Sequence, residues 1–425
     1  MLSFFELVSF EYKKLFKRKS TIISLILVLI VVIVLSIASV TSSQYYHSTG
    51  GISAYEAMNL DRKVISSKAG FINEALIKEA IKQNTAMIAS DENYLINDYG
   101  RHLKSDAYIK YVLPYENVVN IINIIYEMDI HNLSTDGFQI FNTSRIKPID
   151  ALTSQPPDNF YQKITQTLIG RINSLPELSQ NEKEKHFEML SHIKTPFYND
   201  SYDGYMHFFK LFQAITLILM IAIAVCISPI FANEYQQKTD QILLTSKYGK
   251  NKAIFVKLFA GITFSVAVSL TTLFSFLLLM LILHGFSGAN MAIQTLNIFL
   301  TYPVTMLQAS LILIAVAAFV TLLFTMFTML LSTYFKSPFL VITVSFLTLF
   351  VPEFVNVSSK GRIAYQLMQL FPSKAAKFQN IFSEYLFELF GAVFTPAAFY
   401  FAFSIIGSLI IAPFAYRSFK NHQIG

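Results

Sequence analysis

The chain has 425 residues, of which 53% are hydrophobic and only 14% are charged, and its formal net charge is +6. An average soluble domain is about 25% charged, so this composition excludes an ordinary soluble protein and indicates an integral membrane protein. The single cysteine, Cys226, excludes a disulfide within the chain.

The N-terminal segment, residues 1–20, ends in a basic cluster and leads into an uncharged run, residues 21–40. A bilayer core of about 30 Å requires about 20 apolar residues in a helix, so 21–40 is the first predicted span. The run is longer than a signal-peptide core and lacks a clear cleavage site, which predicts a retained anchor. A basic cluster can bind nucleic acid, but beside a span it more often fixes topology and contacts anionic lipid. The cluster consists of Lys13, Lys14, Lys17, Arg18 and Lys19.

Residues 41–207 are polar, and we expect them to form a mainly helical extracytoplasmic domain between the first and second spans. Helical spacing of apolar residues and capping signals predict helices at 71–88, at 118–128, at 158–172 with Asp158 as N-cap, and from the capping box of Ser179 and Glu182 to Leu190.

The membrane domain, residues 208–425, contains five further apolar segments. They are 208–231, 254–283, 303–331, 338–351 and 394–415. The segment 338–351 is short for a span, so a re-entrant segment is an alternative there. We therefore predict an all-α membrane protein with six transmembrane helices.

The loop charges predict that both termini are cytoplasmic, because cytoplasmic loops are enriched in Lys and Arg. With the N-terminal cluster inside, alternation also places inside Lys238, Lys247, Lys250, Lys252, Lys336, Arg417 and Lys420. The loop 285–302 carries no Lys or Arg and falls outside. One conflict is the outer loop near 352–392, which carries four basic residues; if 338–351 does not cross, the C-terminus moves outside.

No motif indicates catalysis or a metal site. The Gly249-Lys250 pair lacks the rest of a phosphate-binding loop, and neither a His-Glu-x-x-His helix nor a Gly-x-Ser-x-Gly elbow occurs. His186 and His192 are six residues apart, which does not place both on one helical face, so we expect solvated surface histidines. We predict no catalytic residue and no metal ligand.

The predicted spans contain almost no ionisable residue in their apolar cores, which argues against an ion-coupled carrier. Lys210 and Lys257 lie near span ends, where a lysine ordinarily extends toward the interface. Gln213 and Gln308 are candidates for hydrogen bonds between helices. Pro229 is expected to bend or end the second span.

The polar stretch FANEYQQKTDQILLTSKYGKNKAIFVKL, residues 231–258, separates the second and third spans. Its order of a glutamate, a leucine pair, a glycine turn and a lysine resembles the coupling-helix region of permeases of the ABC-2 type, which are the membrane subunits of ABC transporters. The residues that carry the resemblance are Glu234, Thr239, Leu243, Leu244, Gly249 and Lys257. The sequence FEYKKL, with Glu11, Lys13 and Lys14, is similar to the amphipathic elbow helix that precedes the first span in this family.

The resemblance implies a dimer of six-span subunits, identical or paired with a similar chain, working with separate ATPase subunits that hold ATP and Mg. This chain would bind no cofactor and no nucleic acid, and membrane lipid would surround it. A coupling helix near 234–249 would insert Leu243, Leu244 and Tyr248 into a groove of the ATPase. Faces of the second and fifth spans would line the substrate path, including Phe212, Gln213 and Thr216.

The expected function is export of an amphipathic or hydrophobic cargo, such as a peptide, antibiotic or lipid, across the cell membrane of a bacterium. A sodium exporter of the same family is an alternative, although membrane carboxylates are lacking. Another alternative is a mechanotransmitting sensor or resistance protein that acts through its outer domain. A receptor without an ATPase is a third alternative and predicts no stable ATPase partner on purification. For the stretch between the second and third spans, the alternative to coupling is a solvated loop whose lysines only set topology.

Overall fold

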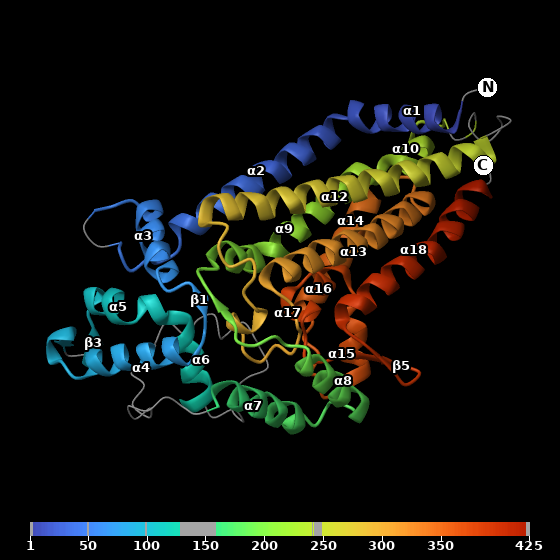
Figure 1. Ribbon diagram of the computed structural model, residues 1–425. Helices are drawn as coiled ribbons and strands as arrows, with labels where there is room; N and C mark the ends of the chain where they lie inside the picture. Colours follow the sequence, from blue (N-terminus) through green and yellow to red (C-terminus); the bar gives the residue numbers. More distant parts are fainter. Residues whose placement is uncertain are drawn as a thin grey trace.

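The computed structural model describes residues 3–48, 51–97, 100–127, 159–239, 241 and 249–421. It consists of an elongated helical bundle with a smaller, mostly helical domain at one end (Figure 1). The chain enters through α1 (Phe4–Lys17) and, after a bend at Arg18, continues as α2 (Lys19–Thr41).

Five described helices are long and apolar enough to cross a membrane. They are α2, α9 (Asp203–Ile227) continued by α10 (Pro229–Gln236), α12 (Ile254–His284), α13 (Met306–Tyr334) and α18 (Pro396–Lys420). The segment predicted as the fifth span forms a shorter helix, α14 (Pro338–Phe350). At 1.5 Å per residue its 13 residues extend about 20 Å, less than the bilayer core, so the count of six spans stays a prediction.

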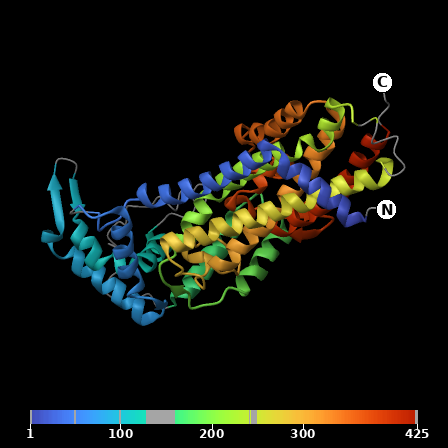
Figure 2. The same ribbon diagram turned by 90° about the horizontal axis from the view of Figure 1, so that it is seen from above.

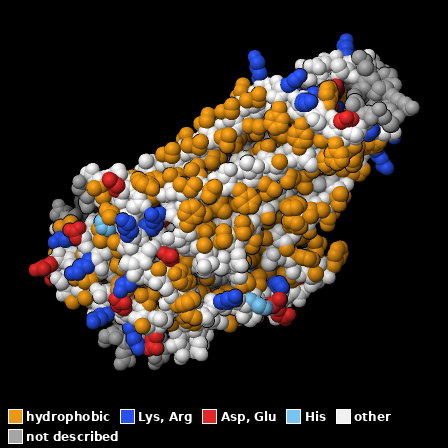
Figure 3. All heavy atoms as spheres, turned by 45° about the horizontal axis from the view of Figure 1, so that its top comes forward, with side chains coloured by type: hydrophobic (Ala, Val, Ile, Leu, Met, Phe, Trp, Pro, Cys, Tyr) orange, Lys and Arg blue, Asp and Glu red, His pale blue; other side chains and the backbone are white. Residues whose placement is uncertain are grey.

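The surface of the bundle matches a membrane environment. Figure 3 shows hydrophobic side chains covering the middle of the molecule, with charged side chains gathered toward its two ends. Exposed apolar residues of α2 such as Ile23, Leu27 and Ile30 belong to this surface. The protein is therefore a multi-pass membrane protein by both composition and surface.

The two termini lie at the same end of the bundle, and the smaller domain lies at the opposite end (Figures 1 and 2). We call the latter the inserted domain, residues 42–202, because it joins α2 to α9. For brevity, the end with the termini is called the terminal end and the other the domain end.

The described part of the inserted domain is mainly helical, as its sequence pattern indicates. It contains α3 (Ala54–Ser66), α4 (Glu74–Ile88), α5 (Ser105–Tyr111), α6 (Glu116–Glu127), α7 (Phe160–Ser174) and α8 (Gln180–Ser191). Two small antiparallel pairs join β1 (Gly70–Phe71) to β4 (Tyr198–Asn199) and β2 (Tyr94–Asn97) to β3 (Gly100–Leu103). The core is formed by buried apolar residues that include Ile72, Ile77, Val118, Ile122 and Phe160.

Capping residues set where these helices begin. The capping box of Ser179 and Glu182 opens α8, as predicted. The helix predicted over 71–88 begins instead at Glu74, because the side chain of Asn73 caps it and Phe71 pairs in β1. The N-cap position of α7 is Asn159. The predicted cap, Asp158, lies outside the described residues.

Other local predictions had mixed outcomes. α9 ends at Ile227 and α10 starts at Pro229, so the predicted break is confirmed. Gln213 donates a hydrogen bond to Glu353 at 3.2 Å, which confirms it as a bridge between helical segments. Gln308 does not bridge helices; it completes the capping box of α13 with Thr305, because it lies in the first turn.

The loops at the domain end pack against the inserted domain. The outer loop after α14 contains α15 (Arg362–Gln369), α16 (Pro372–Ala375), α17 (Phe378–Ile381) and the hairpin of β5 (Phe387–Leu389) and β6 (Ala392–Phe394). Two ion pairs connect it to α7 and α8, namely Arg171 with Glu384, at 2.6 Å, and Arg362 with Glu182. We call these two pairs the outer latch.

The position of His186 corrects the sequence prediction. This side chain is 1% exposed rather than solvated, and its ring nitrogens lie 2.8 Å from Thr301 Oγ1 and from the carbonyl oxygen of Glu384. The cause is tertiary packing, because loops more than a hundred residues later in the chain cover α8. His192, in contrast, is exposed as expected.

Candidate functional site

The stretch between the second and third apolar helices lies at the terminal end, and the structure describes most of it. α10 covers its first part, and a π-helical turn (Gly249–Ala253) leads into α12. Leu243, Leu244 and Tyr248 lie outside the described residues. Their predicted contact with an ATPase therefore stays a prediction.

Lys257 is the buried centre of a group of charges at this end. Its side chain is 1% exposed, in the first turn of α12. The ammonium donates to Glu234 Oε1 at 2.8 Å, to Glu11 Oε2 at 3.2 Å and to the carbonyl oxygen of Ile230 at 3.3 Å. The expectation that Lys257 extends toward the interface is wrong, because two carboxylates and a carbonyl satisfy the charge inside the protein.

Glu234 joins three parts of the chain to its own helix, α10. Besides Lys257 of α12, it accepts a hydrogen bond from Lys14 of α1 at 3.2 Å and one from the hydroxyl of Thr239. The amide of Thr239 also donates to the carbonyl oxygen of Glu234, at 2.9 Å, which closes the turn after α10. We call Glu11, Lys14, Glu234, Thr239 and Lys257 the ionic cluster.

The helical period of α1 accounts for its part in the ionic cluster. Glu11 and Lys14 are three residues apart and therefore lie on one face, next to buried Val8 and Leu15. The same helix contacts α12 through a 2.8 Å hydrogen bond from Tyr12 to Thr263 and through ring packing of Phe16 on Phe264. Lys13, on another face, is exposed.

The charges of the ionic cluster balance, since two carboxylates meet two ammonium groups. Breaking a buried pair by removing one partner costs about 3–5 kcal/mol, because the remaining charge stays buried without compensation. The cluster therefore holds the relative positions of α1, α10 and α12 wherever all four charges are present.

α10 is also fixed on its other sides. The hydroxyl of Ser332 on α13 accepts hydrogen bonds from the amides of Phe231 and Ala232, at 3.1 and 2.9 Å. Tyr235 donates to the carbonyl oxygen of Thr333 at 3.0 Å, and Phe419 of α18 packs its ring 4.8 Å from that of Phe231. A displacement of α10 would therefore be transmitted to α1, α12, α13 and α18.

The residues predicted for a substrate path lie on α9. Phe212 and Thr216 are both 0% exposed, Phe212 packs on the ring of Phe208, and Thr216 donates to the carbonyl oxygen of Phe212. Gln213 is only partly buried and contacts Glu353. In this conformation Phe212 and Thr216 belong to the packed core, so a path along them requires repacking of α9.

Sequence reasoning selected the members of the ionic cluster but not their contacts. Lys257 is separated from Glu11 by 246 positions and Lys14 from Glu234 by 220. The sequence did contain a signal for these contacts, namely a lone lysine among apolar residues at the start of a span. Such a lysine requires a charged partner if it is buried. Among the described residues, no group of three or more His, Cys, Asp or Glu side chains is arranged to hold a metal ion.

Comparison with known proteins gives one clear relationship. The model of the family described as ABC-2 family transporter protein matches residues 11–423. The match includes the ionic cluster, the inserted domain and all the long apolar helices. No curated protein matches the chain.

Proposed function

The chain belongs to the ABC-2 transporter family, and on this premise we propose that it is the permease subunit of an ATP-driven exporter. The observation that carries the proposal is the family match over nearly the whole chain, together with the long apolar helices. The cargo would be amphipathic or hydrophobic, such as a peptide, an antibiotic or a lipid, and would move outward.

The proposed assembly contains two permease subunits, identical or similar, and two separate ATPase subunits that hold ATP and Mg. It would lie in the cell membrane of a bacterium, surrounded by lipid. The terminal end would face the cytoplasm and the inserted domain the exterior. The basic residues around α1, among them Lys13 and Lys17, support this orientation, because cytoplasmic segments next to spans are enriched in Lys and Arg.

In this proposal the segment between α10 and α12 receives force from the ATPase. Leu243, Leu244 and Tyr248 would insert into a groove of that subunit. Glu234 and Lys257 would then transmit the displacement, because they attach both ends of the segment to α1 as well as to each other. Rigid-body shifts of packed helices are a common way to convey such motion.

Movement of α10 would reach the proposed cargo path through α9. The two helices are separated only by Ser228, so a tilt of α10 changes the end of α9 directly. Repacking of Phe212 and Thr216, together with Gln213, would then open a path along this helix. In this proposal the protein alternates between two conformations, and the path along α9 is closed in the described conformation.

Co-purification of the full-length permease with its ATPase tests the coupling hypothesis. The double variant Leu243→Asp, Leu244→Asp should lose most of the ATPase from the purified complex. The matched control is Leu95→Asp, Ile96→Asp, another adjacent apolar pair, which is exposed in β2 of the inserted domain. Full ATPase recovery with the Leu243, Leu244 variant would refute the hypothesis.

A further inference from the structure

A cavity of about 460 Å³ lies between the inserted domain and the ends of α2 and α9. It is lined by the segment after α2, by α3, α6 and the start of α9, and by the loop between α12 and α13. Small-molecule sites typically occupy about 300–1,000 Å³, so the cavity is large enough for a compact ligand. It lies at the domain end, away from the ionic cluster.

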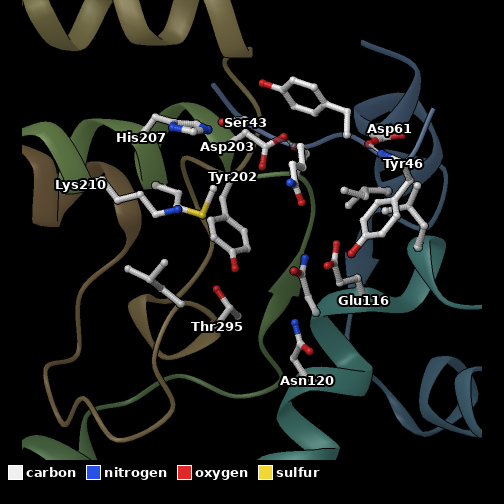
Figure 4. A pocket seen from close by; sticks show the side chains of 18 of the residues that line it. Ser43, Tyr46, Asp61, Glu116, Asn120, Tyr202, Asp203, His207, Lys210 and Thr295 are labelled. Carbon is white, nitrogen blue, oxygen red and sulfur yellow. Dashed lines mark hydrogen bonds between the residues drawn. The ribbon is translucent and has the colours of Figure 1, made fainter. Parts of the chain in front are cut away.

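Two carboxylates face this cavity from different helices. Figure 4 shows Glu116 of α6 and Asp203 of α9 directed toward the same space. Neither carries an ion pair within the described part of the chain; Glu116 accepts a hydrogen bond from Tyr108 at 3.1 Å, and Asp203 one from Ser201 at 3.3 Å. Each begins its helix, where the helix dipole favours a negative charge.

A third carboxylate in the lining, Asp61, is already satisfied. It accepts hydrogen bonds from the backbone amides of Tyr46 and His47, at 2.7 and 3.2 Å, and contacts the His47 ring at 2.5 Å. Lys210 also lines the cavity, across it from Glu116 (Figure 4). The positive charges of Lys210 and Arg62 both act on Asp203, whereas the charges that act on Glu116 are those of Asp203 and Asp61, so Glu116 is the lining carboxylate with room for a cation.

An independent observation at the same cavity is an acceptor without a donor. Gln294 lines the cavity and is 1% exposed. Its amide nitrogen donates to the carbonyl oxygens of Leu300 and Tyr302, both at 2.8 Å, which fixes the side chain. Its Oε1 accepts no hydrogen bond from any described residue, and a buried acceptor left in this state costs about 1–3 kcal/mol.

The remaining lining is apolar or aromatic. Ile121, Met206 and Leu296 supply hydrocarbon surface, and Tyr46 and Tyr202 supply rings against which a cation or an apolar group can pack. A protonated primary amine has three N–H donors and no acceptor, which complements carboxylates and an amide oxygen. A ligand with one such amine and a compact apolar body would match both parts of the lining.

We propose that this cavity binds a monocationic amphiphile, anchored by its primary ammonium group at Glu116, Asp203 and Gln294. The cavity lies where a compound leaving along α9 would reach the inserted domain. The ligand's role as cargo rests on the proposed permease function, whereas binding itself is a property of this chain alone. Binding is therefore measured on the permease without an ATPase, so its failure and a failure of coupling are distinguishable.

The test uses calorimetric titration of the full-length protein in nanodiscs. Phenethylamine is the small-molecule probe, and phenethyl alcohol is its uncharged match. The dipeptide Phe-Leu amide is the peptide probe, and its N-acetylated form is the uncharged match. We expect at least one amine to bind at least tenfold more tightly than its uncharged match. Preference for phenethylamine would indicate a small amine as the ligand, and preference for Phe-Leu amide would indicate a peptide.

Substitutions locate the binding. Glu116→Gln and Asp203→Asn should each weaken amine binding at least tenfold, whereas the exposed controls Glu92→Gln and Asp106→Asn should change it less than twofold. Asn120→Phe, which fills the cavity without removing a carboxylate, should also abolish binding, and an unchanged thermal unfolding temperature shows that each variant is folded. Equal affinity for amine and uncharged match, or wild-type affinity in both carboxylate variants, would overturn the proposal.

Discussion

The ionic cluster at the terminal end and the cavity at the domain end treat charge in different ways. At the terminal end, Glu11 and Glu234 are matched by Lys14 and Lys257, and every charge of the ionic cluster has a partner within the chain. At the domain end, two carboxylates face a cavity without an ion pair among the described residues. The comparison separates charges that hold helices together from carboxylates that are available to a ligand.

The largest expected effect is loss of the lysine at the centre of the ionic cluster. Lys257→Met leaves Glu11 and Glu234 without their buried partner and should lower the free energy of unfolding by about 3–5 kcal/mol. Thermal unfolding of the protein in nanodiscs measures this loss of stability. The control Lys13→Met removes an exposed charge at the same end of the bundle and should change stability by less than about 0.5 kcal/mol.

A second substitution shows whether this loss reflects an uncompensated charge. In the double variant Lys257→Met, Glu234→Met, one buried carboxylate disappears with the lysine, so at least half of the lost stability should return. If the double variant is as unstable as the sum of both single variants, the pairing is not what stabilises this end.

The next effect concerns the pH dependence of amine binding at the cavity. Burial raises the pKa of Glu116 to about 7, opposed by the hydrogen bond from Tyr108, and Asp203 and Asp61 raise it further. The probe amine stays protonated in this range, since a primary amine has a pKa of about 10. Lowering the pH from 8.5 to 5.5 neutralises Glu116, so affinity should fall about tenfold.

The Glu116→Gln variant is the control for this dependence and should show a flat or much shallower pH profile. Other ionisable groups face the same cavity and remain in the variant, namely Tyr45, Tyr46, Asp61, Tyr202, Asp203, His207 and Lys210. An equally steep profile in Glu116→Gln would assign the titration to one of those groups.

The outer latch should give a smaller effect than the ionic cluster. Arg171→Met leaves Glu384, whose side chain is 19% exposed and can be reached by water, so the expected loss is about 1–3 kcal/mol. The matched control is Lys78→Met, which removes the exposed pair with Glu74 on α4 and should cost no more than about 0.5 kcal/mol. A loss as large as that of Lys257→Met would show that solvent access does not separate the two ion-pair groups.

Local features of this fold could be predicted from sequence, and long-range ones could not. The capping box of Ser179 and Glu182 and the break at Pro229 involve residues within a few positions of each other, so pattern and propensity determine them. The burial of His186 depends on Thr301 and Glu384, more than a hundred residues away. The residue pattern of α8 alone therefore does not predict that His186 is buried.

The same distinction applies to the candidate sites. Family resemblance selected Glu11, Lys14, Glu234, Thr239 and Lys257, and the structure brings these five together, while their role in coupling stays a prediction. The cavity at the domain end was not predicted, because its lining comes from five separate segments and the carboxylates of Glu116 and Asp203 are 87 positions apart in the sequence. Only the folded chain places them around one space.

ATP hydrolysis by the reconstituted complex is the most direct test of the central claim that this chain is an ATP-driven permease. The rate should be measured in nanodiscs, with and without amphipathic peptides, antibiotics and lipids. We predict that at least one compound raises the rate at least twofold with the wild-type permease, and that Leu243→Asp, Leu244→Asp abolishes the rise. An ATPase whose rate is the same with and without the permease, for every compound, would contradict the account.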